Sequence, residues 1–214
     1  EEVSQYQHWM DLMAADQSFA DRSAEIGRTA AFLEFLGQDS TVFRDGPVDA
    51  LELYASEEFQ NTANEINWEA HYVDVSRAGD LGLTAGPLTI LDEGEPSSFG
   101  HLVSIWLKQD SRWVLMADIV AGIPGFLSLE VEPNFDDTRP VLEETAHPVM
   151  AMAESNNMQL LIDRDNLFGR SINFRGGQRA LLRYGLENTR VYLPGMAPAV
   201  GADAASSVYG AFLD

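Results

Sequence analysis

The chain has 214 residues, of which 45% are hydrophobic and none is cysteine, and its 34 acidic and 13 basic residues give a formal net charge of −21. The apolar content is enough to bury a core in one or two domains. The lack of cysteine excludes disulfides, thiolate metal ligands and thiol catalysis. A surface this acidic repels phosphate backbones and anionic membranes, so we expect neither nucleic acid nor a membrane as a partner.

The first third of the chain is predicted to be helical. Apolar residues recur at helical spacing over residues 4–22 and again along one side of residues 24–36. Gly37 is expected to end the second helix. A short strand, a turn and a third short helix should follow at residues 41–43, 45–47 and 48–56.

From Trp68 onward the apolar pattern has a period of two, which predicts strands. Four strands are expected, over residues 68–76, 81–91, 100–108 and 112–120. Because their connections are short, the strands should form sequential antiparallel hairpins. Helices followed by such a meander predict an α+β domain in which the helices cover one face of a curved sheet.

This first domain is expected to span residues 1–124. Residues 125–148 have the composition of a linker, with one short strand expected at 127–131. The helical pattern returns over residues 149–168, and a helix of small residues should occupy 202–213.

Two stretches of the chain match at a constant offset of 149 positions, which aligns residues 16–46 with residues 165–195. The identical pairs include Asp16 with Asp165, Phe19 with Phe168, Gly27 with Gly176, Leu33 with Leu182, Val42 with Val191, and Gly46 with Gly195. Residues 149–214 are therefore predicted to be a partial second copy, with helices and a first strand only. Such a half-domain has an apolar face that it cannot cover itself, so we expect it to dock on the first domain or on another chain.

Several local strings carry a resemblance to a known superfamily. They read Ala-Ala-Asp-Gln-Ser-Phe-Ala at 14–20, Gly-Gln-Asp-Ser-Thr-Val-Phe at 37–43, Val-Asp-Val-Ser-Arg-Ala-Gly-Asp at 73–80, Gly-His-Leu-Val-Ser-Ile-Trp at 100–106 and Trp-Val-Leu-Met-Ala-Asp-Ile at 113–119. With the order of elements, they resemble the nuclear transport factor 2-like superfamily, and within it the SnoaL-like and bacterial calcium/calmodulin-kinase-association-like proteins. The match covers residues 5–124, and residues 153–210 as the partial copy.

The resemblance implies a cystatin-like roll, in which a cone-shaped antiparallel sheet wraps the N-terminal helices around an open-ended pocket. Enzymes of this fold use acid–base chemistry in an apolar cavity, where desolvation raises carboxylate pKa values. The superfamily also contains ligand carriers and pure interaction modules, so the fold leaves the function open. The residues expected to line the pocket are Met10, Met13, Trp68, Tyr72 and Trp106, although strand aromatics also serve as ordinary core packing.

Three side chains are candidates for catalysis. His101 and Asp118 belong to the last two expected strands and could form a His–carboxylate pair that faces the pocket. The alternative is a structural hydrogen bond or salt bridge within the sheet. Asp45 loosely resembles the aspartate base of ketosteroid isomerases, but the preceding string has one residue too many, and a turn aspartate in Asp-Gly-Pro is the alternative.

No metal or cofactor is expected, because no metal-ligand spacing, phosphate loop or dinucleotide fingerprint occurs. The function predicted first is binding of a small apolar molecule in the cone. An acid–base enzyme of the isomerase or dehydratase kind and a dimerisation or assembly module without a ligand are the alternatives, and a homodimer is expected. The first residue is glutamate rather than an initiator methionine; signal cleavage or trimming would explain this, and an exported protein is favoured slightly.

Overall fold

The computed structural model describes residues 3–43, 46–56, 65–128, 133–135 and 154–213. The chain divides into two compact units, Glu1–Phe135 (unit 1) and Asp136–Asp214 (unit 2). Unit 1 extends beyond residue 124 because the ring of Phe135 packs against the rings of Tyr6 and Trp9. Within the described ranges, no helix is long and apolar enough to cross a membrane.

Unit 1 begins with two helices that meet at a glycine. Helix α1 spans Gln5–Ile26 and helix α2 spans Arg28–Phe35. Gly27 between them has φ 88° and ψ 158°, a backbone conformation that is essentially restricted to glycine. This is why the helical break lies at Gly27 rather than near residue 23, where the apolar pattern placed it.

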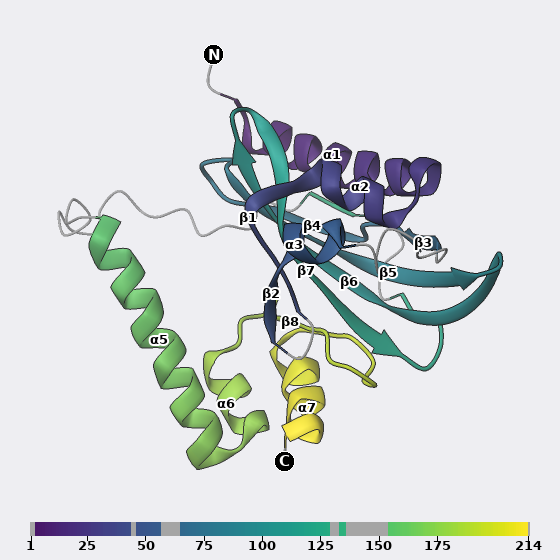
Figure 1. The fold of residues 1–214 in the computed structure, drawn as a ribbon. Helices are drawn as coiled ribbons and strands as arrows, with labels where there is room; N and C mark the ends of the chain where they lie inside the picture. Colours follow the sequence, from purple (N-terminus) through teal and green to yellow (C-terminus); the bar gives the residue numbers. More distant parts are fainter. Residues whose placement is uncertain (1–2, 44–45, 57–64, 129–132, 136–153, 214) are drawn as a thin grey trace. The chain divides into compact units, whose positions relative to one another are not determined.

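The described part of unit 1 contains one open, seven-stranded sheet. The strand bounds are β1 Leu36–Phe43, β2 Pro47–Asp49, β3 Glu65–Trp68, β4 Tyr72–Val75, β5 Leu81–Asp92, β6 Glu95–Gln109 and β7 Arg112–Ile123, with the short helix α3 at Ala50–Ala55. The strand order is β2-β1-β7-β6-β5-β3, and β4 also pairs with β5. The long strands β5, β6 and β7 are sequential antiparallel hairpins, as predicted (Figure 1). Strand β1 joins β7 in parallel, a long-range pairing that no local pattern indicates.

Three predicted boundaries differ from the structure for local reasons. The strand expected at 68–76 is split into β3 and β4, because the chain between them lies against Gly86, where an added Cβ would meet the Glu69 carbonyl oxygen. The polar run 92–98 is mostly strand, and the turn is confined to Glu93 and Gly94, both with positive φ. Gly37 lies inside β1, since the helix has already ended at Phe35. Of the strand expected at 127–131, residues 127 and 128 are not strand and the others are outside the described residues.

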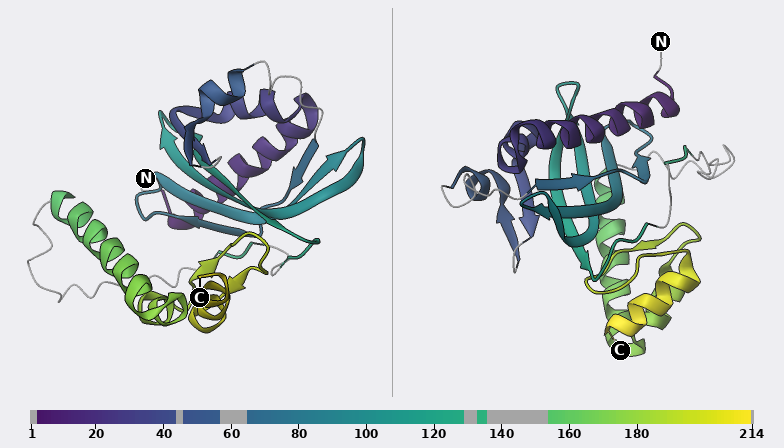
Figure 2. Two further views of the ribbon diagram at one scale, coloured as in Figure 1. Left: turned by 60° about the horizontal axis from the view of Figure 1, so that its bottom comes forward. Right: turned by 90° about the vertical axis from the view of Figure 1, so that its right-hand side faces the viewer.

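Helices α1, α2 and α3 lie on the concave face of the bent sheet, as Figures 1 and 2 show. The core between these layers is rich in large aromatic side chains. Its fully or nearly fully buried members include Trp9, Phe19, Phe32, Tyr54 and Trp106. The rings of Phe19 and Trp68 lie 4.7 Å apart between centroids, and those of Phe32 and Tyr54 also lie 4.7 Å apart. The helices are therefore held on the sheet by aromatic packing.

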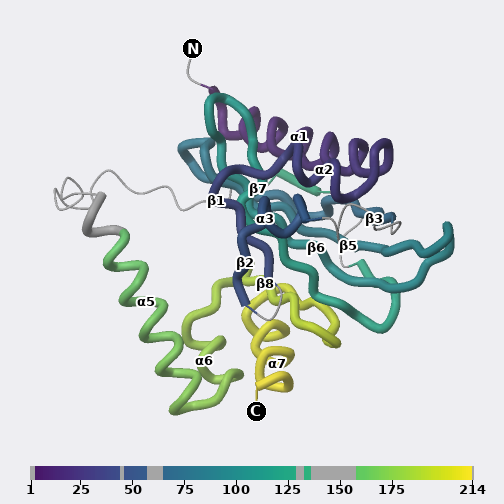
Figure 3. Tube along the Cα trace, in the orientation of Figure 1, coloured from purple at the N-terminus to yellow at the C-terminus, as the bar shows by residue number. Residues whose placement is uncertain are grey.

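Unit 2 is small and largely helical in its described part (Figure 3). Its elements are α5 Glu154–Arg175, α6 Gly177–Tyr184, β8 Arg190–Val191, β9 Ala199–Val200 and α7 Ala202–Leu213. Its own core is a modest cluster around Leu181, Val191, Ala199 and Ala205, with Phe168 and Tyr209 packed against it. The strands β8 and β9 pair with each other in a two-stranded sheet.

The first two described helices of each unit have the same lengths and the same junction. Helices α1 and α5 each have 22 residues, and α2 and α6 each have 8. Their bounds differ throughout by the same 149 positions that separate the matching sequence stretches. Gly176 has φ 82° and ψ 163°, close to the values of Gly27. Both glycine N–H groups close the preceding helix by donating to the carbonyl four residues earlier, at 3.0 Å for Gly27 and 2.9 Å for Gly176.

Candidate functional site

A buried carboxylate lies at the centre of unit 1. Helix α1 presents Trp9, Leu12, Asp16 and Phe19 to the sheet at spacings of three and four residues, so one acidic side chain stands within an apolar stripe. Asp16 is only 2% exposed. A buried carboxylate is costly unless it is hydrogen-bonded, and the sheet supplies the donors.

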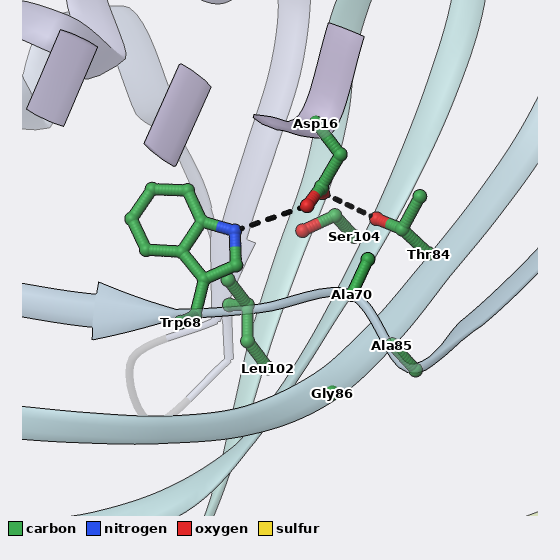
Figure 4. A pocket seen from close by; sticks show the side chains of 8 residues that line it. All are labelled: Asp16, Trp68, Ala70, Thr84, Ala85, Gly86, Leu102 and Ser104. Atoms are coloured by element: carbon green, nitrogen blue, oxygen red, sulfur yellow. Dashed lines mark hydrogen bonds between the residues drawn. The ribbon is translucent and has the colours of Figure 1, made fainter. Parts of the chain in front are cut away.

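Two donors from different strands hold Asp16. The hydroxyl of Thr84 on β5 donates to Oδ1 at 2.7 Å, and the indole Nε1 of Trp68 on β3 donates to Oδ2 at 3.2 Å. The indole Nε1 of Trp106 on β6 donates in turn to the Thr84 hydroxyl oxygen at 3.0 Å. Figure 4 shows the two bonds to Asp16. The helix and three strands are thus joined by one polar network inside an aromatic core.

Burial raises the pKa of the Asp16 carboxyl above its usual range, and the hydrogen bonds from Thr84 and Trp68 oppose this shift. Burial is the largest of these effects, so the site favours the protonated acid more than water does. A carboxyl with a raised pKa can act as a proton donor or as a neutral hydrogen-bond donor if a reacting molecule can reach it.

Two further polar side chains lie in the same row of the sheet. Ser104 on β6 pairs directly with Thr84 on one side and with Asp118 of β7 on the other. All three are almost fully buried. The hydroxyl of Ser104 has no hydrogen-bond partner among the described residues, and it faces the same gap as Asp16.

The space around this network is small. The gap has an empty volume of about 130 Å³, and a water-sized sphere does not fit inside it. Its lining consists of Asp16, Trp68, Ala70, Thr84, Ala85, Gly86, Leu102 and Ser104. Pockets that bind drug-sized ligands have volumes of roughly 300–1,000 Å³. The gap is therefore too small for a ligand of that kind unless its side chains move.

A second hollow at the edge of unit 1 is open to solvent. It is lined by Glu34, Phe35, Arg112 and Trp113. The Glu34 carboxylate is exposed and already paired with the Arg22 guanidinium at 2.7 Å. This hollow has a volume of about 500 Å³, but it is open to solvent, and of its lining side chains only Trp113 is buried. The buried network, in which several polar side chains converge, is therefore taken as the candidate site.

His101 and Asp118 do not form the predicted pair. Asp118 faces the helices beside Ser104, whereas His101 is three residues from Ser104 along β6 and therefore faces the opposite side of the sheet. There His101 makes a backbone hydrogen bond with Leu127, and His71 Nδ1 lies 2.6 Å from the Ser128 hydroxyl. Burial first, and then the nearby His71, lower the pKa of His101.

Most of the residues predicted to line a ligand pocket belong to the packed core, although Trp68 also lines the small gap. Trp106 is completely buried, and Met10, Met13 and Trp68 pack against the same aromatic cluster. Tyr72 lies on β4 and is half-buried. Asp45 lies outside the described residues. In the part of the chain that the structure describes, no group of three or more His, Asp or Glu side chains could hold a metal ion.

Sequence reasoning missed the roles of Asp16, Thr84 and Ser104. For Asp16 a signal was available, because it is the only acid on the apolar stripe that Trp9, Leu12 and Phe19 define. For Thr84 and Ser104 there was no comparable signal. In a strand that alternates apolar and polar residues, a serine or threonine can face either side of the sheet.

Solved structures with related folds resemble this chain over about half of its length. An NTF-2 like protein of unknown function from Shewanella oneidensis MR-1 is 13% identical, with a TM-score of 0.44, over 52% of this chain and 96% of that chain. A protein of unknown function with a cystatin-like fold from Nostoc punctiforme is 13% identical, with a TM-score of 0.44, over 58% and 97%. The association domain of CaMKII from C. elegans is 15% identical, with a TM-score of 0.43, over 55% and 97%.

The first two descriptions name an NTF-2 like protein and a cystatin-like fold, the terms used above for the resemblance of the sequence strings. Similarity at this level says nothing about a ligand or a reaction. The sequence matches no family model and no curated protein.

Proposed function

We propose that unit 1 is an assembly module that pairs with a second copy of the chain, rather than a binding pocket or an enzyme. The observation that supports this is the filled interior. Trp68, Trp106 and Phe19 occupy the space in which a ligand would lie, and the remaining gap is about 130 Å³. A roll whose interior is packed keeps only its surfaces for contact with other molecules.

The surface proposed for this contact is the part of the outer sheet face that lies beyond the buried His101, towards Leu81 and Ile105. Because Thr84, Ser104 and Trp106 face the helices, the alternate positions on β5, β6 and β7 face away from them. These outward positions include Leu81, Leu83, Val103, Ile105, Ala117 and Ile119. Leu81 is 49% exposed and Ile119 is 38% exposed.

Charge distinguishes this face from the remainder of the chain. The outward-facing residues are the alternate ones, 81 to 89 on β5, 99 to 107 on β6 and 117 to 123 on β7. None of them is Asp, Glu, Lys or Arg, although the chain as a whole has a net charge of −21. Two copies of so acidic a protein repel each other. An uncharged apolar face is where two copies approach with the least repulsion and the largest hydrophobic gain.

Analytical ultracentrifugation of the Ile105→Glu variant tests this proposal. The variant places a charge within the outer face, between Leu83 and Ala117 of the neighbouring strands, and should shift the protein to monomer over concentrations of about 1–100 µM. Ala14→Glu is the matched control, since it adds the same charge at an exposed position of α1. A wild-type chain that is monomeric throughout this range would refute the proposal.

An acid–base enzyme is the second candidate, favoured by the buried Asp16 and the unpaired hydroxyl of Ser104 among the described residues. It requires the gap beside Trp68 to widen, because a water-sized sphere does not fit inside it. Native mass spectrometry of the purified protein distinguishes the candidates: a retained small molecule that is lost in Asp16→Asn favours binding or catalysis. Its absence favours assembly.

We also infer that residues 154–213 are a partial second copy of the helical part of unit 1. The equal helix lengths, the matching glycine junctions and the constant offset of 149 positions support this. The correspondence of α5 with α1 indicates which side of α5 is the counterpart of the buried side of α1.

A further inference from the structure

Two histidines contact the segment that follows the sheet. Residues 124–128, called the strap below, come directly after β7 and form neither helix nor strand. His101 of β6 makes a hydrogen bond with the backbone of Leu127. His71 lies between β3 and β4, and its Nδ1 atom is 2.6 Å from the Ser128 hydroxyl oxygen. Side chains from two separate parts of unit 1 are thus joined to neighbouring residues of the strap.

The strap explains why one part of the outer sheet face is covered. His101 pairs directly with Ala121 of β7, so both side chains lie on the face away from the helices. They are 3% and 4% exposed, whereas Ile119, two positions before Ala121 on the same face, is 38% exposed. Because His101 is hydrogen-bonded to Leu127, the strap lies over this covered part of the sheet.

The surroundings of the two histidines suit one positive charge better than two. The Glu69 carboxylate lies 3.4 Å from Nε2 of His71, so a charge on His71 has an acid beside it. The outward positions of β5, β6 and β7 offer His101 no acid, and β4 turns Tyr72 and Asp74 to the same side. Burial first, and then the nearby His71, lower the pKa of His101, while its hydrogen bond to the strap opposes this shift. A charged His101 is therefore disfavoured for as long as it stays covered.

We propose that the strap is a pH-dependent cover of the outer sheet face, which His71 and His101 hold in place at neutral pH and which lifts when His101 takes up a proton. Lifting gives the charged imidazole the access to water that it lacks beneath the strap. An uncovered histidine titrates near pH 6.5, so the equilibrium constant for opening rises by up to about tenfold for each pH unit below that value. The rise ends at the lowered pKa of the covered His101.

Lifting the strap changes the surface that unit 1 presents to other molecules. It adds the part of the sheet around His101 and Ala121 to the outer face near Leu81 and Ile105. This consequence rests on the proposed function, since it concerns the same face. The opening itself is a property of a single chain and can be measured whether or not the chain assembles.

Thiol labelling of the folded, full-length chain measures the opening. The chain has no cysteine, so Ala121→Cys introduces a single thiol at a covered position of the outer face. Its rate of reaction with dithiodipyridine is divided at each pH by the rate for Ala14→Cys, at an exposed position of α1. This ratio should rise about three- to tenfold between about pH 6.5 and pH 5.5. It should stay constant over the same range when His101→Gln is added, because glutamine does not ionise.

Two further variants make the outcomes decisive. Ala31→Cys reports global unfolding, because Ala31 is fully buried in the core between the helices and the sheet. If its normalised rate equals that of Ala121→Cys at every pH, the cover is lost only when unit 1 unfolds, and the inference is wrong. His71→Gln removes one contact with the strap and the neighbouring charge, so the ratio should start higher at about pH 7.5 and rise less.

A ratio that does not change with pH, or a rise that persists in His101→Gln, overturns the inference. These results are distinguishable from a failure of the proposed function. A monomeric chain whose ratio rises in acid retains the strap and loses the assembly proposal, whereas a dimer whose ratio is constant does the reverse.

Discussion

The Thr84 hydroxyl donates a hydrogen bond to the carboxylate of Asp16 at 2.7 Å, joining the middle of the first helix to a strand residue 68 positions away. Both residues are almost fully buried. The contact fixes the position of α1 along the sheet and the rotation of α1 about its own axis. Only one such rotation brings Asp16 between Thr84 and Trp68. A buried polar network of this kind favours one packing arrangement over others.

Replacing Asp16 by Asn should change how stability depends on pH. Because the pKa of Asp16 is raised in the folded chain, folding is favoured where the carboxyl is protonated and loses stability as pH rises above about 4. The asparagine side chain cannot ionise, so the free energy of unfolding in urea should fall less between about pH 4 and pH 8 than in the wild type. Asp21→Asn on the exposed side of α1 is the control. Identical slopes for the wild type and Asp16→Asn would contradict the assignment.

His101 should make the protein sensitive to mild acid. Its pKa is lowered in the folded state, so the unfolded chain binds a proton first, and stability falls as pH decreases below about 6.5. His101→Gln should flatten urea-unfolding free energies between about pH 6.5 and pH 5. Ser104→Ala, on the other face of the same strand, should shift stability equally at every pH in this window. If the free energy of unfolding of His101→Gln still falls steeply in acid, another group is responsible for the acid sensitivity.

Alanine at either helix junction should be destabilising by a similar amount. Gly27 and Gly176 both adopt a positive φ with an extended ψ, which costs other residues about 1–3 kcal/mol. An added Cβ at Gly27 has no neighbour within 4 Å, so the whole cost at that site is backbone strain. Chemical denaturation of Gly27→Ala and Gly176→Ala measures both values. A neutral Gly176→Ala would argue against a common origin of the two junctions.

Trp106→Ala tests whether the interior of the cone is structural. Trp106 is completely buried and holds Thr84 by a hydrogen bond, so its loss should cost about 3–5 kcal/mol. Added indole should recover part of this stability by filling the cavity. Tyr6→Ala removes an aromatic ring that is 52% exposed and should cost far less. A small effect of Trp106→Ala would mean that the interior tolerates empty space, as a ligand pocket does.

The order and type of most elements could be predicted from the sequence because they depend on local periodicity. The long strands β5, β6 and β7 alternate apolar and polar residues, and their short turns leave only antiparallel hairpins possible. The helices were recognised by spacing, yet their junction was misplaced, since an unusual backbone conformation at Gly27 leaves no trace in apolar spacing. The parallel pairing of β1 with β7 was not predicted, because the partners are far apart in the chain.

The candidate site was predicted less well. His101 and Asp118 were correctly placed on neighbouring strands, but the predicted pair depends on which face each side chain takes. The register of Ser104 with Asp118 decides this, and register is a property of two strands together. Trp68 and Trp106 were expected to line a pocket, and both point inward. Whether inward aromatic side chains surround a space or fill it depends on the volumes of all their neighbours.

By itself, the sequence determined the α+β order, the apolar stripes of α1 and α5, and the match of two stretches 149 positions apart, since each is a local pattern of residue types. Only the tertiary structure decided that Asp16 meets Thr84, that His101 and Asp118 face opposite sides, and that aromatic rings close the interior. The reason is physical: these outcomes are set by strand register and side-chain packing between distant segments, which no single segment encodes.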